Sequence, residues 1–278
     1  MSVELMNFET LALRRDGPVL HVTLNRPEVR NAMSIAMVRE LRMVLAQQEM
    51  AQHELTHKTP GATRVIVLRG AGGHFCAGAD LRDLAAARAQ LAENPDAVAA
   101  MNAAFGDLCV AYADTGLAVV AVLEGTVMGG GFGLACVADV ALAGTSTEFR
   151  LPETSLGVVP AQIAPFLVER LGFAEAKRLA VTGARLNAQT ALDLRLVHEV
   201  HAASALDRAV ATVVADILQC APGAVAATKA LIRKARLHDA ASLVHEAAET
   251  FSRAALGAEG IDGTTAFLQK RKAGWVPQ

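Results

Sequence analysis

The sequence predicts an α/β layered fold followed by a helical C-terminal region, and three observations lead to this prediction. Residues 64–69 and 117–123 are short, β-branched apolar runs of the kind that form buried parallel strands. Glycine-rich segments follow both runs, as they do at the strand-to-helix corners of α/β proteins. Beyond residue 166 the sequence has helical character to its end, so we expect helices to complete the chain.

The chain begins with a predicted β-hairpin and a helix. Residues 8–13 and 19–24 alternate between apolar and polar side chains around an Asp16-Gly17 turn signal. Ser34 is a suitable N-cap for the helix that follows, and Thr59-Pro60-Gly61 ends the helical pattern. The protein therefore opens with strands.

The later elements complete this plan. A third apolar run, residues 137–143, is predicted as another buried strand. Glycine, proline or short polar breaks then separate predicted helices at residues 166–171, 174–182, 188–194, 205–218, 221–237, 240–256 and 261–272.

Composition excludes several classes of protein. The 278 residues favour one main domain, and 26 basic against 28 acidic side chains leave a net charge of -2, which attracts neither nucleic acid nor an anionic membrane. The four cysteines are widely spaced, and no signal peptide or membrane span is recognised. We therefore expect a cytoplasmic protein without a disulfide framework.

Two glycine-rich corners follow the buried runs, at residues 74–80 and 125–133. Neither contains the lysine or the glycine spacing of a nucleotide-binding loop. Successive glycines instead let a ligand approach the backbone closely, and free N–H groups at a helix start stabilise a developing negative oxygen.

Four ordered motifs make the chain resemble the enoyl-CoA hydratase/isomerase (crotonase) family. They are residues 24–27 with 31–32, residues 75–80, residues 129–131 and residues 149–153, and residues 265–272 also resemble the terminal helix of that family. The resemblance covers nearly the whole chain. It implies a crotonase-like ββα superhelix core with the active site in residues 1–200, and a helical C-terminal trimerisation region in residues 201–278.

The resemblance also implies the catalytic groups. The backbone amides of Ala77 and Gly130 would hold the thioester oxygen of an acyl-CoA, which stabilises charge that appears only in the transition state. Glu153 would move the proton, as a general base or acid whose pKa burial brings toward the working pH. Asp80 is a candidate substrate-binding residue, although its position also suits a helix or turn cap.

One position departs from the family pattern. Hydratases of this family carry a second glutamate where this chain has Gly133, and no acid stands at Ala161, where some isomerases of the family place an aspartate. Residues 157–166 resemble branched glutaconyl-CoA hydratases, including isohexenylglutaconyl-CoA and methylglutaconyl-CoA hydratases. We therefore expect Gly133 to make room for a branched acyl group. Glu153 would carry out hydration alone, or with Gln162 or the substrate's own carboxylate orienting water.

The expected reaction is hydration of an enoyl-CoA, with coenzyme A as part of the substrate and no metal or redox cofactor. Isomerisation of the double bond by Glu153 alone is the alternative. By resemblance, Phe267 and Lys270 of a neighbouring subunit would contact coenzyme A, in a homotrimer or a dimer of trimers. Arg30 is a weaker coenzyme A candidate.

Two other classes of function compete with this interpretation. His53-Glu54-Leu55-Thr56-His57 has the H-E-x-x-H pattern of zinc metalloproteases, but it lies at the end of its predicted helix. A non-catalytic RNA-binding relative would need basic patches interleaved with aromatics, whereas the only locally basic segments, residues 233–236 and 270–272, have none. Both remain remote alternatives.

Overall fold

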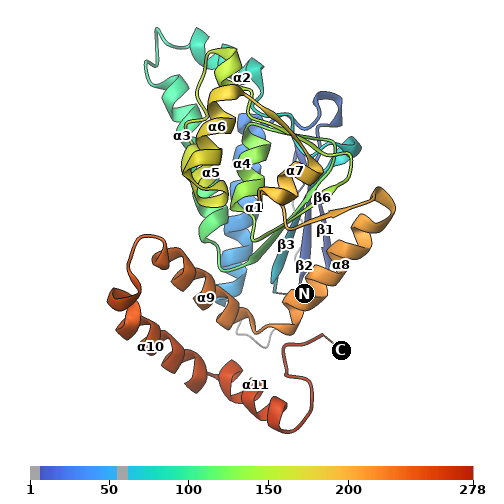
Figure 1. Cartoon of the computed structure of the whole chain (residues 1–278), viewed down its shortest axis with the longest axis vertical. Coiled ribbons are helices and arrows are strands. Elements are labelled where there is room, and N and C mark those ends of the chain that lie inside the picture. The colour runs from blue at the N-terminus through green and yellow to red at the C-terminus, as the bar shows by residue number, and fades with distance from the viewer. Residues whose placement is uncertain (1–6, 55–61, 278) are drawn as a thin grey trace.

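The structure is a computed structural model and describes residues 7–54 and 62–277 (Figure 1). Its main sheet runs in the order β1-β2-β3-β4-β6-β9, and every neighbouring pair except β1 and β2 is parallel. The strands are β1 (Leu11–Asp16), β2 (Val19–Leu24), β3 (Val65–Gly70), β4 (Ala118–Leu123), β6 (Val140–Gly144) and β9 (Glu199–His201).

The strands of the main sheet are apolar on both faces because helices cover both. Ile66 and Leu68 of β3 pack into one core with α1 (Ile35–Glu54), α3 (Ala97–Asp114) and α4 (Gly130–Val137). Val65 and Val67 point the other way, into a second core with α8 (Ala203–Gln219). This two-sided burial explains why the run shows no polar alternation.

A small second sheet lies beside the site described below. It consists of β5 (Thr126–Met128), β7 (Glu148–Arg150) and β8 (Arg185–Asn187). Apart from the C-terminal helices described below, the other elements are the short 3-10 helices η1 (Pro27–Val29), η2 (Ala71–Gly73) and η3 (Glu153–Leu156), and the helices α2 (Leu81–Ala89), α5 (Ala164–Leu171), α6 (Phe173–Thr182) and α7 (Ala188–Asp193).

The three largest differences between predicted and observed boundaries concern the hairpin, the run at 137–143 and the last helix. The hairpin turns at Gly17-Pro18, because β1 begins only at Leu11 and continues through Asp16. The run at 137–143 is not one strand, since Val137 ends α4 and β6 starts at Val140. The last helix, α11, spans Ala258–Leu268 and ends before Lys270.

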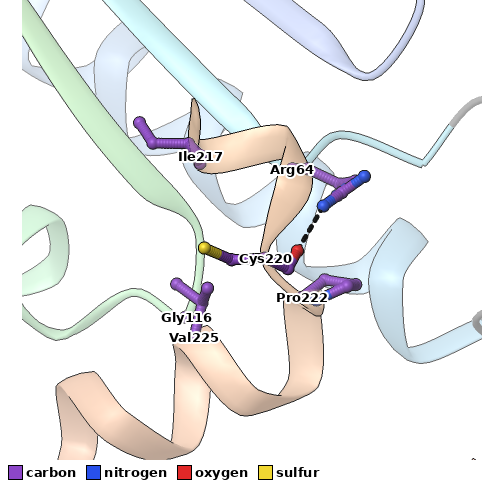
Figure 2. Close-up of a pocket in the computed structure, with 6 residues that line it drawn as sticks. All are labelled: Arg64, Gly116, Ile217, Cys220, Pro222 and Val225. Atoms are coloured by element: carbon purple, nitrogen blue, oxygen red, sulfur yellow. Dashed lines mark hydrogen bonds between the residues drawn. The ribbon is translucent and has the colours of Figure 1, made fainter. Parts of the chain in front are cut away.

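The C-terminal helices form an arm that extends away from the sheet (Figure 1). The arm is α9 (Pro222–Ala235), α10 (Ala240–Leu256) and α11, and α9 leaves α8 at an angle of 98°. At this bend the Arg64 guanidinium donates to the carbonyls of Leu218, Cys220 and Trp275. Figure 2 shows the small pocket beside it, lined by Arg64, Gly116, Ile217, Cys220, Pro222 and Val225.

In the described ranges, no helix taken singly has the length and apolar composition to cross a membrane. Only α8 and α9 taken together, across their bend, satisfy that test.

Candidate active site

Two glycine corners and one glutamate meet at a single place. Hydrogen bonds from Cys76 N to Thr126 O (3.0 Å) and from Met128 N to Cys76 O (2.9 Å) join the corners side by side. A Cβ placed on Gly129 would lie 3.3 Å from Gly78 Cα and only 3.0 Å from Glu153 Oε1. The φ angles of Gly78 (97°) and Gly129 (48°) also favour glycine. Glycine at these positions therefore permits the close approach.

The backbone amides at the corners are not equivalent. Ala77 N donates to Arg30 O at 3.0 Å, so the expectation that this amide binds a substrate oxygen is wrong: the fold already uses it. Two residues on, Ala79 is exposed, and no hydrogen bond within residues 7–54 and 62–277 uses its amide. Gly130 is the first residue of α4, where an amide has no acceptor inside the helix. Ala79 and Gly130 therefore supply the available donors.

Glu153 begins η3, immediately after Pro152. Its Oε2 atom is buried and finds no hydrogen-bond partner in the described part of the chain. Burial raises the pKa of the Glu153 carboxyl above its ordinary value. A carboxylate oxygen that is buried without a partner is costly to a fold, and a raised pKa suits a group that must accept and return a proton near neutral pH.

Gly133 does not leave an empty space. A Cβ placed there would lie 2.4 Å from Ile163 Cγ2 and 3.4 Å from the Phe105 ring. Ile163 is 3% exposed and belongs to the main core. The expectation that Gly133 opens room for a branched acyl group is therefore wrong, because the protein's own side chains fill the position.

Gln162 is turned toward α3. Its Nε2 donates to Asn102 Oδ1 at 2.8 Å, and its Oε1 would lie 2.1 Å from a Cβ on Gly106. The side chain lines a surface groove of about 350 Å³ between α3 and α9. The structure does not bring Gln162 into contact with Glu153.

Asp80 is a structural carboxylate. It caps α2 by accepting from Arg82 N at 3.0 Å, and it accepts from Arg26 Nη2 at 2.8 Å. Burial opposes its ionisation, but the hydrogen bonds from Arg26 and the Arg82 amide outweigh burial, so the pKa of Asp80 is lowered. Direct contact with substrate is therefore not its role in this geometry. The cap interpretation is the correct one.

The coenzyme A candidates lie apart from one another. Arg30 is exposed and adjoins the site through its carbonyl bond to Ala77. Phe267 is 85% exposed in α11, and Lys270 follows that helix with a φ of 53°. Figure 1 shows α11 in the arm, away from α4 of the same chain. One chain alone therefore does not bring Phe267 or Lys270 to the site.

Only part of the H-E-x-x-H pattern at residues 53–57 lies among the described residues. His53 lies near the end of α1, whereas His57 falls outside the described residues. Within residues 7–54 and 62–277, no three side chains among His, Cys, Asp and Glu converge as metal ligands would.

Four residues of the site escaped prediction or were seen only as parts of a motif. Ala79 is hidden by its similarity to Ala77, and nothing local marks Ile163 or Phe105 as neighbours of Gly133. Asn31 carried a weak signal, because asparagine tolerates the left-handed backbone that it adopts here (φ 56°).

Together these groups can perform acid–base chemistry next to a polarised carbonyl. The two free amides, one from each glycine corner, suit an oxygen that gains negative charge, and a single carboxylate stands beside them. Such a site favours proton transfer at carbon atoms adjacent to a thioester.

Comparison with known proteins agrees with this chemistry. The sequence model described as enoyl-CoA hydratase/isomerase matches residues 14–278. An enoyl-CoA hydratase/isomerase structure from Marinobacter aquaeolei and that of Pseudomonas aeruginosa AtuE each superpose with a TM-score of 0.90, at 45% and 48% identity, over 97% of this chain and 100% of theirs. The carnitinyl-CoA dehydratase of Proteus mirabilis is 30% identical over 273 residues, 96% of this chain and 98% of that protein.

These likenesses span the sheet, both glycine corners and the helical arm alike. The predicted α/β crotonase fold with a helical C-terminal region is therefore confirmed. This chain is an enzyme of the enoyl-CoA hydratase/isomerase (crotonase) family.

Proposed function

We propose that this enzyme adds water to the double bond of a branched, glutaconyl-type 2-enoyl-CoA thioester. The observation that carries the proposal is the Glu153 carboxyl group beside the free amides of Ala79 and Gly130, because its Oε2 atom is buried without a hydrogen-bond partner in the described part of the chain. Enoyl-CoA hydratase-type chemistry follows from the family, and the acyl group is the finer part of the proposal.

The reaction uses each group once in each role. The two amides donate to the thioester oxygen, which makes the carbon at position 3 electrophilic. Glu153 removes a proton from water, the water oxygen bonds to carbon 3, and the electron pair of the double bond moves toward the thioester oxygen. Glu153 then returns the proton to carbon 2. The raised pKa of Glu153 helps both transfers, because it lies closer to the working pH.

The resemblance of residues 157–166 to glutaconyl-CoA hydratases supports the branched acyl group. Gly133 adds no support, since Ile163 and Phe105 occupy its surroundings. The space for a branch must therefore come from another wall of the site.

Isomerisation is the second candidate, and one observation favours it. Ile163 fills the position from which a second carboxylate would act, so Glu153 works alone. A single carboxylate suffices to take a proton from carbon 2 of a 3-enoyl thioester and return it to carbon 4.

For coenzyme A we propose a site shared between subunits of a homotrimer or a dimer of trimers. The arm, within residues 201–278, would carry Phe267 and Lys270 to a neighbour, while residues 1–200 hold Glu153 and the amides. Exposed apolar side chains on the arm support this, including Phe251 (75% exposed) and Leu256 (76% exposed). Lysine suits the coenzyme A phosphate as a compact charge.

The test is an activity screen over straight and branched 2-enoyl and 3-enoyl thioesters, including 3-methylglutaconyl-CoA. Water addition is followed by loss of the enoyl absorbance and by mass, and isomerisation by movement of the double bond at constant mass. Glu153→Gln should abolish either activity, whereas Glu148→Gln, at an exposed position on β7, serves as the matched control. Normal hydration by the Glu153→Gln variant would refute the proposal.

A further inference from the structure

Backbone hydrogen bonds join the segment at residues 30–33 to the first glycine corner. Ala77 N donates to Arg30 O at 3.0 Å, Met33 N donates to Gly78 O at 2.7 Å, and Asp80 N donates to Met33 O at 3.0 Å. Met33 thus bonds the Gly78 carbonyl before Ala79 and the Asp80 N–H after it, and neither polar backbone group of Ala79 itself. Met33 and Ala79 form a parallel β-bridge in which only Met33 uses its own N–H and carbonyl. The N–H of Ala79 therefore points away from the segment at residues 30–33.

The segment at residues 30–33 contains two residues with left-handed backbone conformation, and hydrogen bonds of the Asn31 side chain stabilise it. Arg30 and Asn31 both adopt the left-handed region, with φ of 50° and 56°, which costs free energy in residues other than glycine. The buried Asn31 side chain accepts from Arg26 N at 2.8 Å and donates to Ala71 O and His74 O at 2.9 and 2.7 Å. It thereby fixes the segment to the start of the glycine corner.

An ion pair fixes the other end of the corner. Arg26 Nη2 donates to Asp80 Oδ2 at 2.8 Å, and Nη1 donates to Ala32 O at 2.7 Å. The side chains are 18% and 9% exposed, so solvent screens the pair little. Asp80 is the residue directly after Ala79, and displacement of its carboxylate would therefore tilt the preceding peptide.

We propose that Arg26, Asn31 and Asp80 are positioning residues that aim the Ala79 amide at the thioester oxygen. The inference rests on the proposed function, in which that amide is one of two donors. Donors of this kind stabilise a transition state only when they are held in place beforehand, so their misplacement lowers kcat more than it weakens substrate binding.

The test compares Asp80→Asn and Arg26→Lys with a matched control, Asp139→Asn. Asparagine at position 80 can still cap α2 but loses the charge that faces Arg26. Asp139 likewise accepts from one backbone amide, Val119 N, and one cationic side chain, Lys229 Nζ, at 2.7 Å each, but it lies just before β6 and is not part of the first glycine corner. Lysine at position 26 keeps the charge but lacks the planar fork whose two nitrogens bond Asp80 and the Ala32 carbonyl separately.

We expect Asp80→Asn and Arg26→Lys to lower kcat by about tenfold to a hundredfold with KM changed by less than about threefold. Asp139→Asn should keep kcat within about twofold at a comparable loss of thermal stability. Equal kcat values in all three variants, measured well below their unfolding temperatures, would refute the positioning role.

A spectroscopic measurement separates this inference from the proposed function. The infrared carbonyl band of 3-methylglutaconyl-CoA, labelled with ¹³C at the thioester carbon, should move to lower wavenumber on the wild-type enzyme and move less on Asp80→Asn. An unshifted band on the wild-type enzyme would refute the proposed function. A full shift on both proteins would refute the positioning role alone.

Discussion

Gly133→Ala tests whether the core fills the position of the second carboxylate. The added Cβ would lie 2.4 Å from Ile163 Cγ2, about 1 Å inside ordinary van der Waals contact. Overpacking of a buried site costs about 1–3 kcal/mol, whereas alanine is better than glycine in a helix by about 1 kcal/mol. We therefore expect a net loss of about 1 kcal/mol in the free energy of unfolding.

The identity of residue 163 provides a sharp control. Leucine has no methyl group in the Cγ2 position, whereas valine retains one. Gly133→Ala should therefore be relieved by Ile163→Leu, with a coupling of about 1 kcal/mol in a double-mutant cycle. Ile163→Val should show almost none.

Urea denaturation of all six proteins at one protein concentration measures these values, because association would otherwise shift apparent stability. A Gly133→Ala protein at least as stable as the wild type would refute the reasoning. Equal coupling with leucine and valine would also refute it, since the contact would not be the one described.

Three further predictions concern the amide, the carboxylate and the arm. Gly130→Pro should lower kcat by about 10²–10³ relative to Gly130→Ala, because both add a Cβ at the helix start but only proline removes the N–H. In the pH profile of kcat/KM, the acidic limb should lie above the ordinary glutamate pKa of about 4.3. Folding raises the pKa of Glu153, so ionisation of this carboxyl group at high pH destabilises the folded state. Glu153→Gln should therefore be more stable than the wild type at pH 8. The difference in the free energy of unfolding should disappear as the pH falls and Glu153 becomes protonated. Arg64→Ala should speed hydrogen exchange in α9 through α11, because it frees the carbonyls of Leu218, Cys220 and Trp275; unchanged exchange there would contradict the account of the bend.

The layered fold was predictable because its strands are buried on both faces. The 64–69 and 117–123 runs carry β-branched residues on both faces, and that pattern is typical of a parallel sheet. The boundary at Val137 was not predictable in the same way. Residues 130–143 are apolar almost throughout, and an apolar run does not distinguish a buried helix from a buried strand.

The site was predictable in its chemistry but not in its detail. The motif around Glu153 and the glycine at position 130 stand out in the sequence. The choice between the amides of Ala77 and Ala79 depends on the segment at residues 30–33, which uses one amide and turns the other away. Likewise, the contact of Ile163 with Gly133 joins residues from separate elements, and local sequence contains no sign of it.

The distribution of satisfied polar groups locates the active site more directly than the depth of any cavity. Around the first corner, the amides of Ala77 and Asp80 have backbone acceptors, and the Asp80 carboxylate has two donors. Within the described part of the chain, the Ala79 amide and Glu153 Oε2 have no such partners. A carboxylate oxygen that is shielded from water and unpaired contributes nothing to the fold, unless a ligand completes it together with the exposed Ala79 amide nearby. A thioester oxygen would accept from the Ala79 amide, and a transferable proton would bond Glu153 Oε2. Substrate binding should therefore stabilise the first glycine corner more than it stabilises the strands of the main sheet.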